Sequence, residues 1–259
     1  MSTTIVFDLD DTLYRECDYV RSGIRSVDLW VQWRLGVHGF DAAAMQLWNA
    51  GRREKLFDAA LTGLGVAVEP ATIAAMVAIY REHVPRIRLA SDASAFLMSD
   101  HGFGLALISD GFGIAQRRKV AALELSRFVF DPIIYTDDWG AEYWKPHPRA
   151  FEAVEAAHRG RSSRFVYVAD NPAKDFLAPR ALGWATVQID RADAVHSRTP
   201  PSERHRADTQ IRSLRDLTRQ RIEGLEQQRA HFVRLGRAGG VDGEPAAHGV
   251  DPDAGIAPD

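Results

Sequence analysis

The sequence predicts an α/β fold, built on a parallel sheet into which a wholly helical segment is inserted. Short apolar runs that end in acidic, glycine-rich or lysine-bearing turns recur along the chain, and a helical pattern follows most of them. This alternation is typical of a parallel sheet with helical crossovers. Residues 15–88 interrupt it, because their apolar residues repeat only at helical spacing. The chain has 259 residues, of which 46% are hydrophobic, enough for a substantial core and a second, smaller domain.

The first predicted strand is the apolar run of residues 5–7, which leads directly into Asp8-Leu9-Asp10-Asp11-Thr12. Open α/β proteins place their chemistry at the carboxyl ends of such strands. In a regular strand Asp8 and Asp10 would share one face, and two carboxylates held so close repel each other unless a cation or a shared proton relieves them. The stretch therefore predicts a site, with simple turn formation by the acidic residues as the alternative.

The helical segment at residues 15–88 is predicted to hold three helices, the last of which ends at Pro85. We expect its core to contain Trp30, Trp33 and Trp48, because aromatic side chains bury a large area. A substrate pocket lined by the same rings is the alternative.

Two further strands end in groups that suit an anion. The strand at residues 104–108 runs into Ser109-Asp110-Gly111, where a hydroxyl and backbone N–H groups before a helix make a cradle for an anion. The strand at residues 128–135, in which Pro132 indicates an edge position or a bulge, is followed by Lys145 in the segment Lys-Pro-His-Pro. These prolines stiffen the backbone and so present the lysine.

A fourth strand end is acidic. Asp170 follows the strand predicted at residues 165–169, and Asp175 stands at the start of the next helix. Strands at residues 185–189 and 209–211 complete the predicted sheet, with a loose surface loop at 191–206 between them.

The expected domain organisation follows from these elements. A core of residues 1–14 and 89–217 carries the acidic strand ends, and residues 15–88 form the helical insert. An arginine-rich helix is expected at 218–238. The tail at 239–259 contains neither lysine nor arginine and is rich in Gly, Ala, Pro and Asp, so it cannot bury enough apolar surface to order itself.

The composition limits which kinds of binding partner and which cellular compartment we expect for this protein. A net charge of −3 and a pI of about 6.3 indicate no nucleic acid and no anionic membrane as partner. The single cysteine, Cys17, cannot form an internal disulfide, which fits a reducing cytosol. The apolar run at Ile5 breaks at Asp8, too early for a signal peptide, and no apolar segment is long enough to cross a bilayer. We therefore expect a cytoplasmic protein.

Together the strand ends predict a phosphoryl-transfer site. A carboxylate such as Asp8 can act as nucleophile and form an aspartyl-phosphate. Carboxylates beside a phosphate require a cation, and hard oxygen ligands with a phosphate suit Mg²⁺. The Ser109 hydroxyl, backbone amides and Lys145 can hold the phosphate oxygens as charge develops on them.

The four groups, in this order, resemble the motifs of the haloacid dehalogenase superfamily, and specifically its aspartate-dependent phosphatases with a helical cap. The resemblance covers residues 4 to 217. It is carried by Asp-x-Asp-x-Thr at Asp8, by Ser109, by Lys145 in Lys-Pro-x-Pro, and by the pair Asp170 and Asp175. It implies a Rossmann-like core in which residues 15–88 are the cap.

The resemblance also implies a role for each motif residue. Asp8 is expected to be the nucleophile and a metal ligand. Asp10 is expected to protonate the leaving oxygen, to activate water afterwards, and to bind the metal through its backbone carbonyl. Asp170 is expected to be a further metal ligand, and Asp175 to support the metal shell or to orient Lys145. Phosphate is expected to be bound by Ser109, Asp110, Gly111 and Lys145.

The expected function is Mg²⁺-dependent hydrolysis of a phosphate monoester of a small metabolite through an aspartyl-phosphate. The presence of Asp10 argues against dehalogenation, because a halide leaving group needs no proton. A sugar-phosphate mutase with the same site and a non-catalytic binding or regulatory protein are the alternatives. The sequence specifies neither the substrate nor the oligomeric state. Six positions are candidates to face the substrate, with a solvated helix face as the alternative for each: Glu16, Tyr19, Trp48, Asn49, Arg52 and Arg53.

Overall fold

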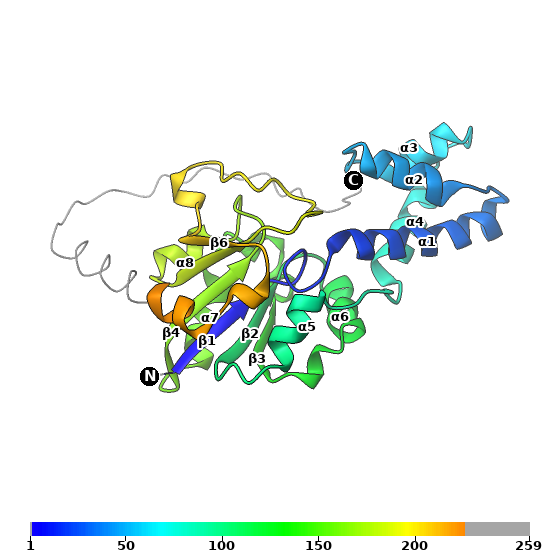
Figure 1. The fold of residues 1–259 in the computed structure, drawn as a ribbon. Helices are drawn as coiled ribbons and strands as arrows, with labels where there is room; N and C mark the ends of the chain where they lie inside the picture. The colour runs from blue at the N-terminus through cyan, green and yellow to red at the C-terminus, as the bar shows by residue number, and fades with distance from the viewer. Residues whose placement is uncertain (1, 226–259) are drawn as a thin grey trace. The chain divides into compact units, whose positions relative to one another are not determined.

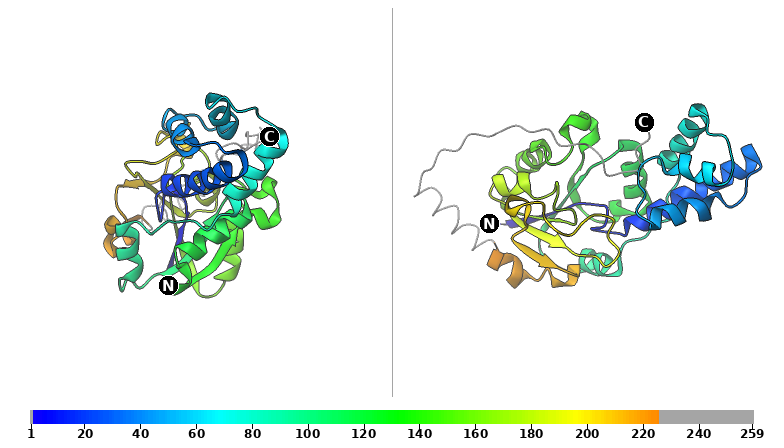
Figure 2. Two further views of the ribbon diagram at one scale, coloured as in Figure 1. Left: turned by 90° about the vertical axis from the view of Figure 1, so that its right-hand side faces the viewer. Right: turned by 90° about the horizontal axis from the view of Figure 1, so that it is seen from above.

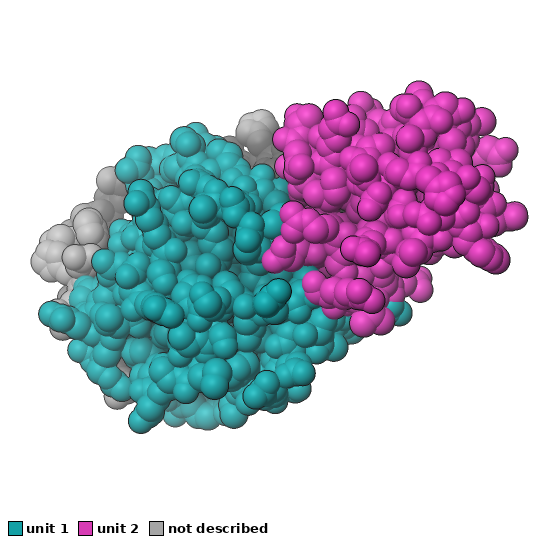
Figure 3. Space-filling view, turned by 45° about the vertical axis from the view of Figure 1, so that its right-hand side comes forward, with its two compact units in different colours: residues 1–17, 87–242 teal, residues 18–86, 243–259 magenta. Residues whose placement is uncertain are grey.

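The computed structural model describes residues 2–225, which form two compact units. The described residues of the first, the core unit, are 2–17 and 87–225, and those of the second, the helical unit, are 18–86 (Figure 3). A short helical stretch is present at residues 219–225. The remainder of the arginine-rich helix predicted at 218–238, and the tail predicted at 239–259, lie outside the described residues.

The core unit contains a six-stranded parallel sheet, which confirms the predicted α/β fold (Figure 1). Strand β1 lies in the interior of the sheet, with β2 on one side and β4 on the other. The strand order therefore reverses at β1, and in open sheets such a reversal opens a crevice at the carboxyl ends of the strands. The order across the sheet is β3 (Phe130–Tyr135), β2 (Gly104–Ser109), β1 (Ser2–Phe7), β4 (Ser162–Ala169), β5 (Ala185–Ile189) and β6 (Thr209–Ile211).

The sequence of β1 is continuously apolar because this strand is covered on both faces. Ile5, Val6 and Phe7 are completely buried, as expected for an interior strand of a parallel sheet. Ile5 lies opposite Leu105 of β2 and Val166 of β4 in the parallel registers. The first polar side chains therefore appear only where the strand ends.

The edge strand β3 contains Pro132, as its sequence predicts. The register between β2 and β3 shifts between Leu105 and Leu107, close to this proline. Proline has no N–H to donate to the ladder, so an edge strand or an irregular pairing is where a sheet tolerates it.

The helices of the core unit pack on the sheet. Phe151 of α7 meets the rings of Tyr167 and Trp184 edge-on at centroid distances of 5.0 and 5.5 Å, in a fully buried cluster. The helices are α5 (Ser91–Met98), α6 (Gly113–Ala122), α7 (Arg149–Ala157) and α8 (Leu177–Ala181). Short 3₁₀ turns are η1 (Leu125–Arg127), η2 (Thr136–Trp139), η3 (Ala141–Tyr143), η4 (Glu203–His205) and η5 (Leu214–Asp216).

The helical unit has no strand within residues 18–86, in agreement with the helical periodicity of its sequence (Figures 1 and 2). Phe57 links the helices by contacting Phe40 and Tyr80 at ring distances of 5.8 and 5.7 Å. Four helices are present rather than the three predicted: α1 (Glu16–Leu35), α2 (Phe40–Asn49), α3 (Leu56–Gly63) and α4 (Pro70–Glu82).

The expected tryptophan core of this unit is only partly correct. Trp48 is buried, and Trp30 is half-buried. Trp33 is 80% exposed, so its assignment to the core was wrong. The buried stripe of α1 runs through residues such as Val27 and Val31, and Trp33 lies off that stripe.

The loop after β5 is not loose at its start, contrary to the prediction for residues 191–206. The Arg191 guanidinium donates two hydrogen bonds to the Thr12 carbonyl, at 3.1 and 2.5 Å, and forms an ion pair with Asp92 at 3.1 Å. The Val195 N–H donates to Asp11 Oδ2 at 2.7 Å. These contacts tie the loop to the turn that follows β1.

Within residues 2–225, no helix has the length and apolar character that crossing a membrane requires.

Candidate active site

The turn after β1 presents the first two acidic side chains. The strand ends at Phe7, so Asp8 and Asp10 lie beyond it and do not share a strand face, as a longer regular strand would have required. The Asp8 N–H donates to the Val168 carbonyl of β4 at 2.9 Å, which fixes the start of the turn against the neighbouring strand. The two carboxylates then contact different lysines.

Lys145 lies between two carboxylates from different strand ends. Its Nζ is 2.6 Å from Asp8 Oδ1, 2.7 Å from Asp175 Oδ1 and 3.0 Å from Tyr167 Oη. The lysine side chain is completely buried. Burial opposes its charge, but Asp175 and Asp8 outweigh burial, so the pKa of Lys145 lies well above its ordinary value. Lys145 is therefore a permanent cation inside the acidic cluster.

Asp8 is a buried carboxylate that lacks full compensation for its charge. Burial raises the pKa of Asp8 from 3.8 to about 7, although Lys145 opposes the shift, and Asp175 raises it further. The Thr12 hydroxyl donates a long hydrogen bond, of 3.4 Å, to Asp8 Oδ2. Additional positive charge near Asp8 would favour its ionised, nucleophilic form.

Asp170 has an oxygen that fits a metal ion. Its Oδ2 is buried and accepts no hydrogen bond within the described residues. Burial, together with Asp175 and Asp8, raises the pKa of Asp170 well above its ordinary value. An unpaired buried carboxylate is costly, and a hard cation removes that cost. The ligand set predicted from the sequence, the carboxylates of Asp8 and Asp170 with the main-chain carbonyl of Asp10, consists of hard oxygen donors, which suit Mg²⁺.

Asp175 uses both of its oxygens within the protein. Oδ1 pairs with Lys145, and Oδ2 accepts the Asn171 N–H at 3.0 Å. Of the two roles expected for Asp175, these bonds favour orientation of Lys145 over direct metal ligation. In the part of the chain that the structure describes, no three acidic, histidine or cysteine side chains gather into a metal cluster. A metal held here would therefore rely on a backbone carbonyl, water and phosphate for its remaining ligands.

The turn after β2 places Ser109 at the same edge of the sheet. Ser109 is completely buried, and its hydroxyl donates to Gln116 Oε1 at 3.0 Å. Gly111 has a φ of +104°, and a Cβ at this position would lie 2.8 Å from Gln116 Nε2. A glycine is therefore required at the point where the turn passes over Gln116.

Asp110 supports the site and does not offer its carboxylate to a phosphate. It accepts bonds from the Thr136 hydroxyl at 2.7 Å, from the Lys145 N–H at 3.2 Å and from Lys174 Nζ at 3.0 Å. Burial opposes its charge, but Lys174 and Lys145 outweigh burial and lower the pKa of Asp110. The ionised Asp110 side chain therefore holds the backbone of Lys145. The group that Asp110 itself can offer to an anion is its own main-chain N–H.

Three residues of the site were not assigned a role from the sequence. Lys119 and Gln116, on α6, contact Asp10, and Lys174 contacts Asp110. In the sequence they read as ordinary helix or loop residues. The signal available was their spacing, because Gln116 and Lys119 are three apart and so lie on one helix face directly after the Ser109 turn.

The six candidate substrate-facing positions fall into three groups. Glu16 is placed near Asp10 and Asp11: burial raises its pKa to about 8, and these two carboxylates add to the shift. Tyr19 and Trp48 are buried in the helical unit, where the Arg53 guanidinium stacks 3.6 Å from the Trp48 ring centroid. The remaining two, Asn49 and Arg52, are exposed.

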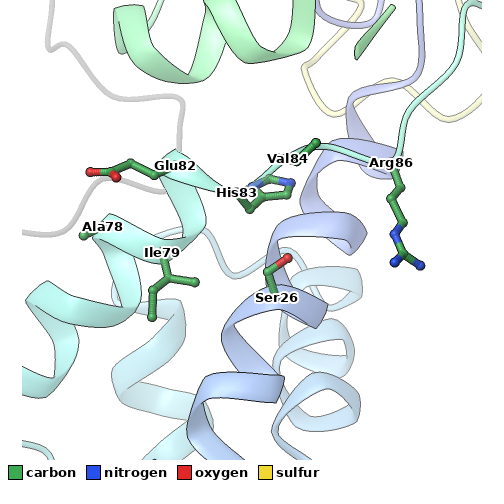
Figure 4. Close-up of a pocket in the computed structure, with 7 residues that line it drawn as sticks. All are labelled: Ser26, Ala78, Ile79, Glu82, His83, Val84 and Arg86. Atoms are coloured by element: carbon green, nitrogen blue, oxygen red, sulfur yellow. The ribbon is translucent and has the colours of Figure 1, made fainter. Parts of the chain in front are cut away.

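A surface pocket within the helical unit carries none of this chemistry. It lies between α1 and the end of α4, beside Ser26 and His83 (Figure 4). Its two charged residues, Glu82 and Arg86, extend away from each other, so their charges do not converge on a ligand (Figure 4).

Comparisons with known proteins agree with the chemistry of the strand ends. The family of haloacid dehalogenase-like hydrolases matches residues 3–183. The chain is 27% identical to a glyceraldehyde 3-phosphate phosphatase of Methanopyrus kandleri, over 74% of this chain and 85% of that protein. It is 26% identical to a ribulose-1,5-bisphosphate 5-phosphatase of Halopiger xanaduensis, over 84% of this chain and 98% of that protein.

Solved structures share the fold. The hydrolase YfnB of Bacillus subtilis, bound to magnesium, superimposes with a TM-score of 0.61 at 17% identity, over 83% of this chain and 96% of that one. The L-2-haloacid dehalogenase of Xanthobacter autotrophicus gives a TM-score of 0.55 at 18% identity, over 84% and 97%.

The family match spans every strand end that carries an acid, the serine or the lysine of the site, and the relatives that share its sequence are phosphatases. The protein is therefore a phosphatase that belongs to the haloacid dehalogenase-like hydrolase family.

Proposed function

We propose that this phosphatase hydrolyses the phosphate monoester of a small sugar or sugar-like metabolite in two steps, through an aspartyl-phosphate on Asp8. The observation that carries the proposal is the pairing of the buried Asp8 carboxylate with Lys145, near Asp170, whose buried Oδ2 accepts no hydrogen bond from residues 2–225. The substrate class is supported by the names of the relatives, which act on glyceraldehyde 3-phosphate and ribulose 1,5-bisphosphate.

In the first step an Asp8 oxygen attacks phosphorus, and the bond from phosphorus to the ester oxygen breaks. Asp10 gives its proton to the departing oxygen, which leaves as an alcohol. In the second step a water gives a proton to Asp10 and attacks phosphorus, and the bond to Asp8 breaks. Inorganic phosphate is released, and both aspartates return to their starting forms.

The other groups hold the phosphate while these bonds change. The donors for its oxygens are the backbone N–H groups of the Asp110–Gly111 turn, the Ser109 hydroxyl and the Lys145 ammonium. To bind phosphate, the hydroxyl and the ammonium each exchange a hydrogen bond that they make within the protein, to Gln116 Oε1 and to Asp8 Oδ1. Asp175 and Asp110 keep Lys145 in place through its ammonium and its backbone N–H.

Mg²⁺ would be held by Asp8, Asp170 and the Asp10 carbonyl, and when bound it neutralises the carboxylates and the phosphate. The buried Asp170 oxygen that accepts no hydrogen bond from residues 2–225 supports this assignment. The choice of metal is supported by the Bacillus subtilis hydrolase of the same fold, whose structure is bound to magnesium.

We further propose that residues 18–86 act as a cap that selects the substrate. They are inserted between Asp8 and Ser109 in the chain. The segment that returns from them is held at the turn after β1, because the Ala90 N–H donates to the Leu13 carbonyl at 2.9 Å. A cap that closes excludes bulk water and strengthens the electrostatics inside the site.

The test of the mechanism is Asp8→Asn. The amide keeps the shape of the carboxylate but cannot attack, so phosphate release should fall below detection while the circular dichroism spectrum is unchanged. The matched control is Asp131→Asn, which changes an exposed carboxylate paired with Arg161 and should keep full activity. Mass spectrometry of an acid-quenched wild-type reaction should find the phosphoryl group on the peptide that contains Asp8.

Turnover by purified Asp8→Asn, or a phosphoryl group on another residue, would refute the assignment. A screen of sugar phosphates, nucleotides and phosphorylated acids identifies the substrate. Phosphate release from simple monoesters without a bisphosphate activator distinguishes the phosphatase from a sugar-phosphate mutase.

A further inference from the structure

Helix α6 buries two polar side chains on the face that lies beside the turn after β1. Gln116 and Lys119 are each 4% exposed. A lysine is almost never buried to this extent unless an anion pairs with it. Here the anion is Asp10: Lys119 Nζ lies 2.7 and 2.9 Å from its two carboxylate oxygens.

Asp10 is held from two further directions. Gln116 Nε2 donates to Asp10 Oδ2 at 3.3 Å, and the Tyr14 hydroxyl donates to Oδ1. Two donors that are distant in the sequence, Gln116 and Lys119, and one local donor, Tyr14, thus determine where this carboxylate points. Lys119 is 109 residues away in the chain, so this arrangement depends on the packing of α6 against the turn.

Stability alone does not explain the pair of Lys119 and Asp10. Desolvation of two charges roughly cancels their attraction, and apolar residues of similar size often replace such a pair without loss of stability. The Asp10 side chain is 22% exposed, so it would find water if the lysine were absent. The net contribution of the pair to stability is therefore small.

Gln116 connects Asp10 to the phosphate-binding turn. Its Oε1 accepts the Ser109 hydroxyl at 3.0 Å, while its Nε2 donates to Asp10. The side chain thus sets the distance between the hydroxyl expected to hold phosphate and the carboxylate expected to move the proton. Gly111 leaves the room that this side chain occupies.

We propose that Lys119, assisted by Gln116, is a positioning residue that holds Asp10 in the place where it exchanges its proton with the leaving oxygen and then with water. The inference rests on the proposed function, in which Asp10 is the acid and base. The carboxylate with which Lys119 pairs in the structure is the form that Asp10 takes once it has given up its proton, so the Lys119 ammonium is already in place to stabilise that charge. An interaction that strengthens as the reaction proceeds accelerates it.

The test uses esters that differ in how much their leaving group needs a proton. p-Nitrophenolate leaves without one, phenolate needs it more, and the alkoxide of glycerol 3-phosphate needs it most. For Lys119→Met we expect kcat/KM to fall about 10- to 100-fold with glycerol 3-phosphate and less than about threefold with p-nitrophenyl phosphate. The value of kcat/KM reports the steps up to loss of the alcohol, so the comparison isolates the proton transfer to it.

The matched control is Arg117→Met on the same helix. Arg117 pairs with Asp138 at 2.7 Å, on the exposed side of α6, so all three esters should be hydrolysed at the wild-type rate. Thermal unfolding confirms that each variant is folded. If Lys119→Met fails to fold, Lys119→Gln, which keeps a donor but loses the charge, takes its place.

A double-mutant cycle with Asp10→Asn separates this inference from the function on which it rests. If Lys119 acts through Asp10, adding Lys119→Met to Asp10→Asn should change kcat/KM by less than about twofold. Equal losses with all three esters, or a full additional loss in the Asp10→Asn background, would overturn the inference alone. Wild-type turnover by Asp10→Asn itself would instead overturn the proposed function.

Discussion

At the scale of single residues, the site concentrates buried acids whose charges are only partly neutralised. Burial raises the pKa of Asp8 to about 7 and that of Glu16 to about 8, and it raises the pKa of Asp170 well above its ordinary value. Lys145 neutralises part of this charge. The remaining charge is what a cation at Asp170 would balance.

These shifts predict how stability depends on pH and on Mg²⁺. A carboxyl whose folded-state pKa is raised contributes stability below its unfolded pKa, and this contribution is lost as pH rises through the folded pKa. The metal-free protein should therefore lose stability between about pH 4 and pH 8 at these groups. Mg²⁺ binds the ionised form, so it should raise the melting temperature more at about pH 8 than at about pH 5.

Thermal unfolding with chelator and with Mg²⁺ at both pH values measures this effect. Asp170→Asn is the control variant, because it removes one of the buried acids and one of the proposed ligands. It should be less sensitive to pH and should gain little from Mg²⁺. Equal gains at the two pH values, or an undiminished gain in Asp170→Asn, would contradict the assignment of the metal ligands.

At the scale of elements, two helices of the helical unit approach each other at a glycine. A Cβ at Gly23 of α1 would lie 2.4 Å from Cε2 of Tyr80 on α4. Tyr80 is itself held between the rings of Tyr19 and Phe57, at 5.5 and 5.7 Å. The ring cannot move aside without disturbing this cluster, so the contact requires a glycine.

We therefore expect Gly23→Ala to lower the free energy of unfolding by about 1–3 kcal/mol, the usual cost of overpacking. The matched variant is Gly63→Ala at the end of α3, where no atom lies within 4 Å of the added Cβ. There the loss of backbone freedom in the unfolded chain should leave stability unchanged or raise it by up to about 1 kcal/mol. Urea unfolding followed by circular dichroism compares the two, and equal effects would contradict the close packing described for Gly23.

At the scale of the whole molecule, the chain divides its residues between a sheet-based core and a helical unit. The strand ends that carry Asp8, Ser109, Lys145 and Asp170 all belong to the core unit. None of the residues that we assign to catalysis, to phosphate binding or to metal binding lies within residues 18–86. This division suggests that the two units can be altered separately.

The corresponding prediction concerns specificity. Arg52 is exposed on the helical unit, so Arg52→Ala should change the relative kcat/KM values among natural phosphate esters while leaving p-nitrophenyl phosphate almost unaffected. Trp48→Ala is unsuitable for this test, because Trp48 is buried and its loss would destabilise the unit. Arg127→Ala, an exposed arginine of the core unit paired with Glu124, should leave the whole profile unchanged. A uniform loss on every ester in Arg52→Ala would argue against a selective cap.

The strands of the sheet and the order of the polar groups at their ends can be predicted from local patterns in the chain. An interior parallel strand must be apolar on both faces, so the run from Ile5 to Phe7 could be recognised without its neighbours. The last two strands were predicted at the residues where they occur, at 185–189 and 209–211. The helical insert was equally clear, because its periodicity is a local property of the chain. The roles predicted for the acids and for Lys145 stay predictions that the proposed experiments test.

The contacts between side chains of the site depend on how distant elements pack, so local patterns do not predict them. Lys119 contacts Asp10 across 109 residues, and nothing in the spacing of α6 identifies its partner. Asp110 reads as a turn residue beside a phosphate cradle, but folding directs its carboxylate to Lys145 and Lys174. Trp33 reads as core and is exposed. A side chain's type indicates what it can bind, whereas its partner depends on the distances and burial that arise when distant elements pack together.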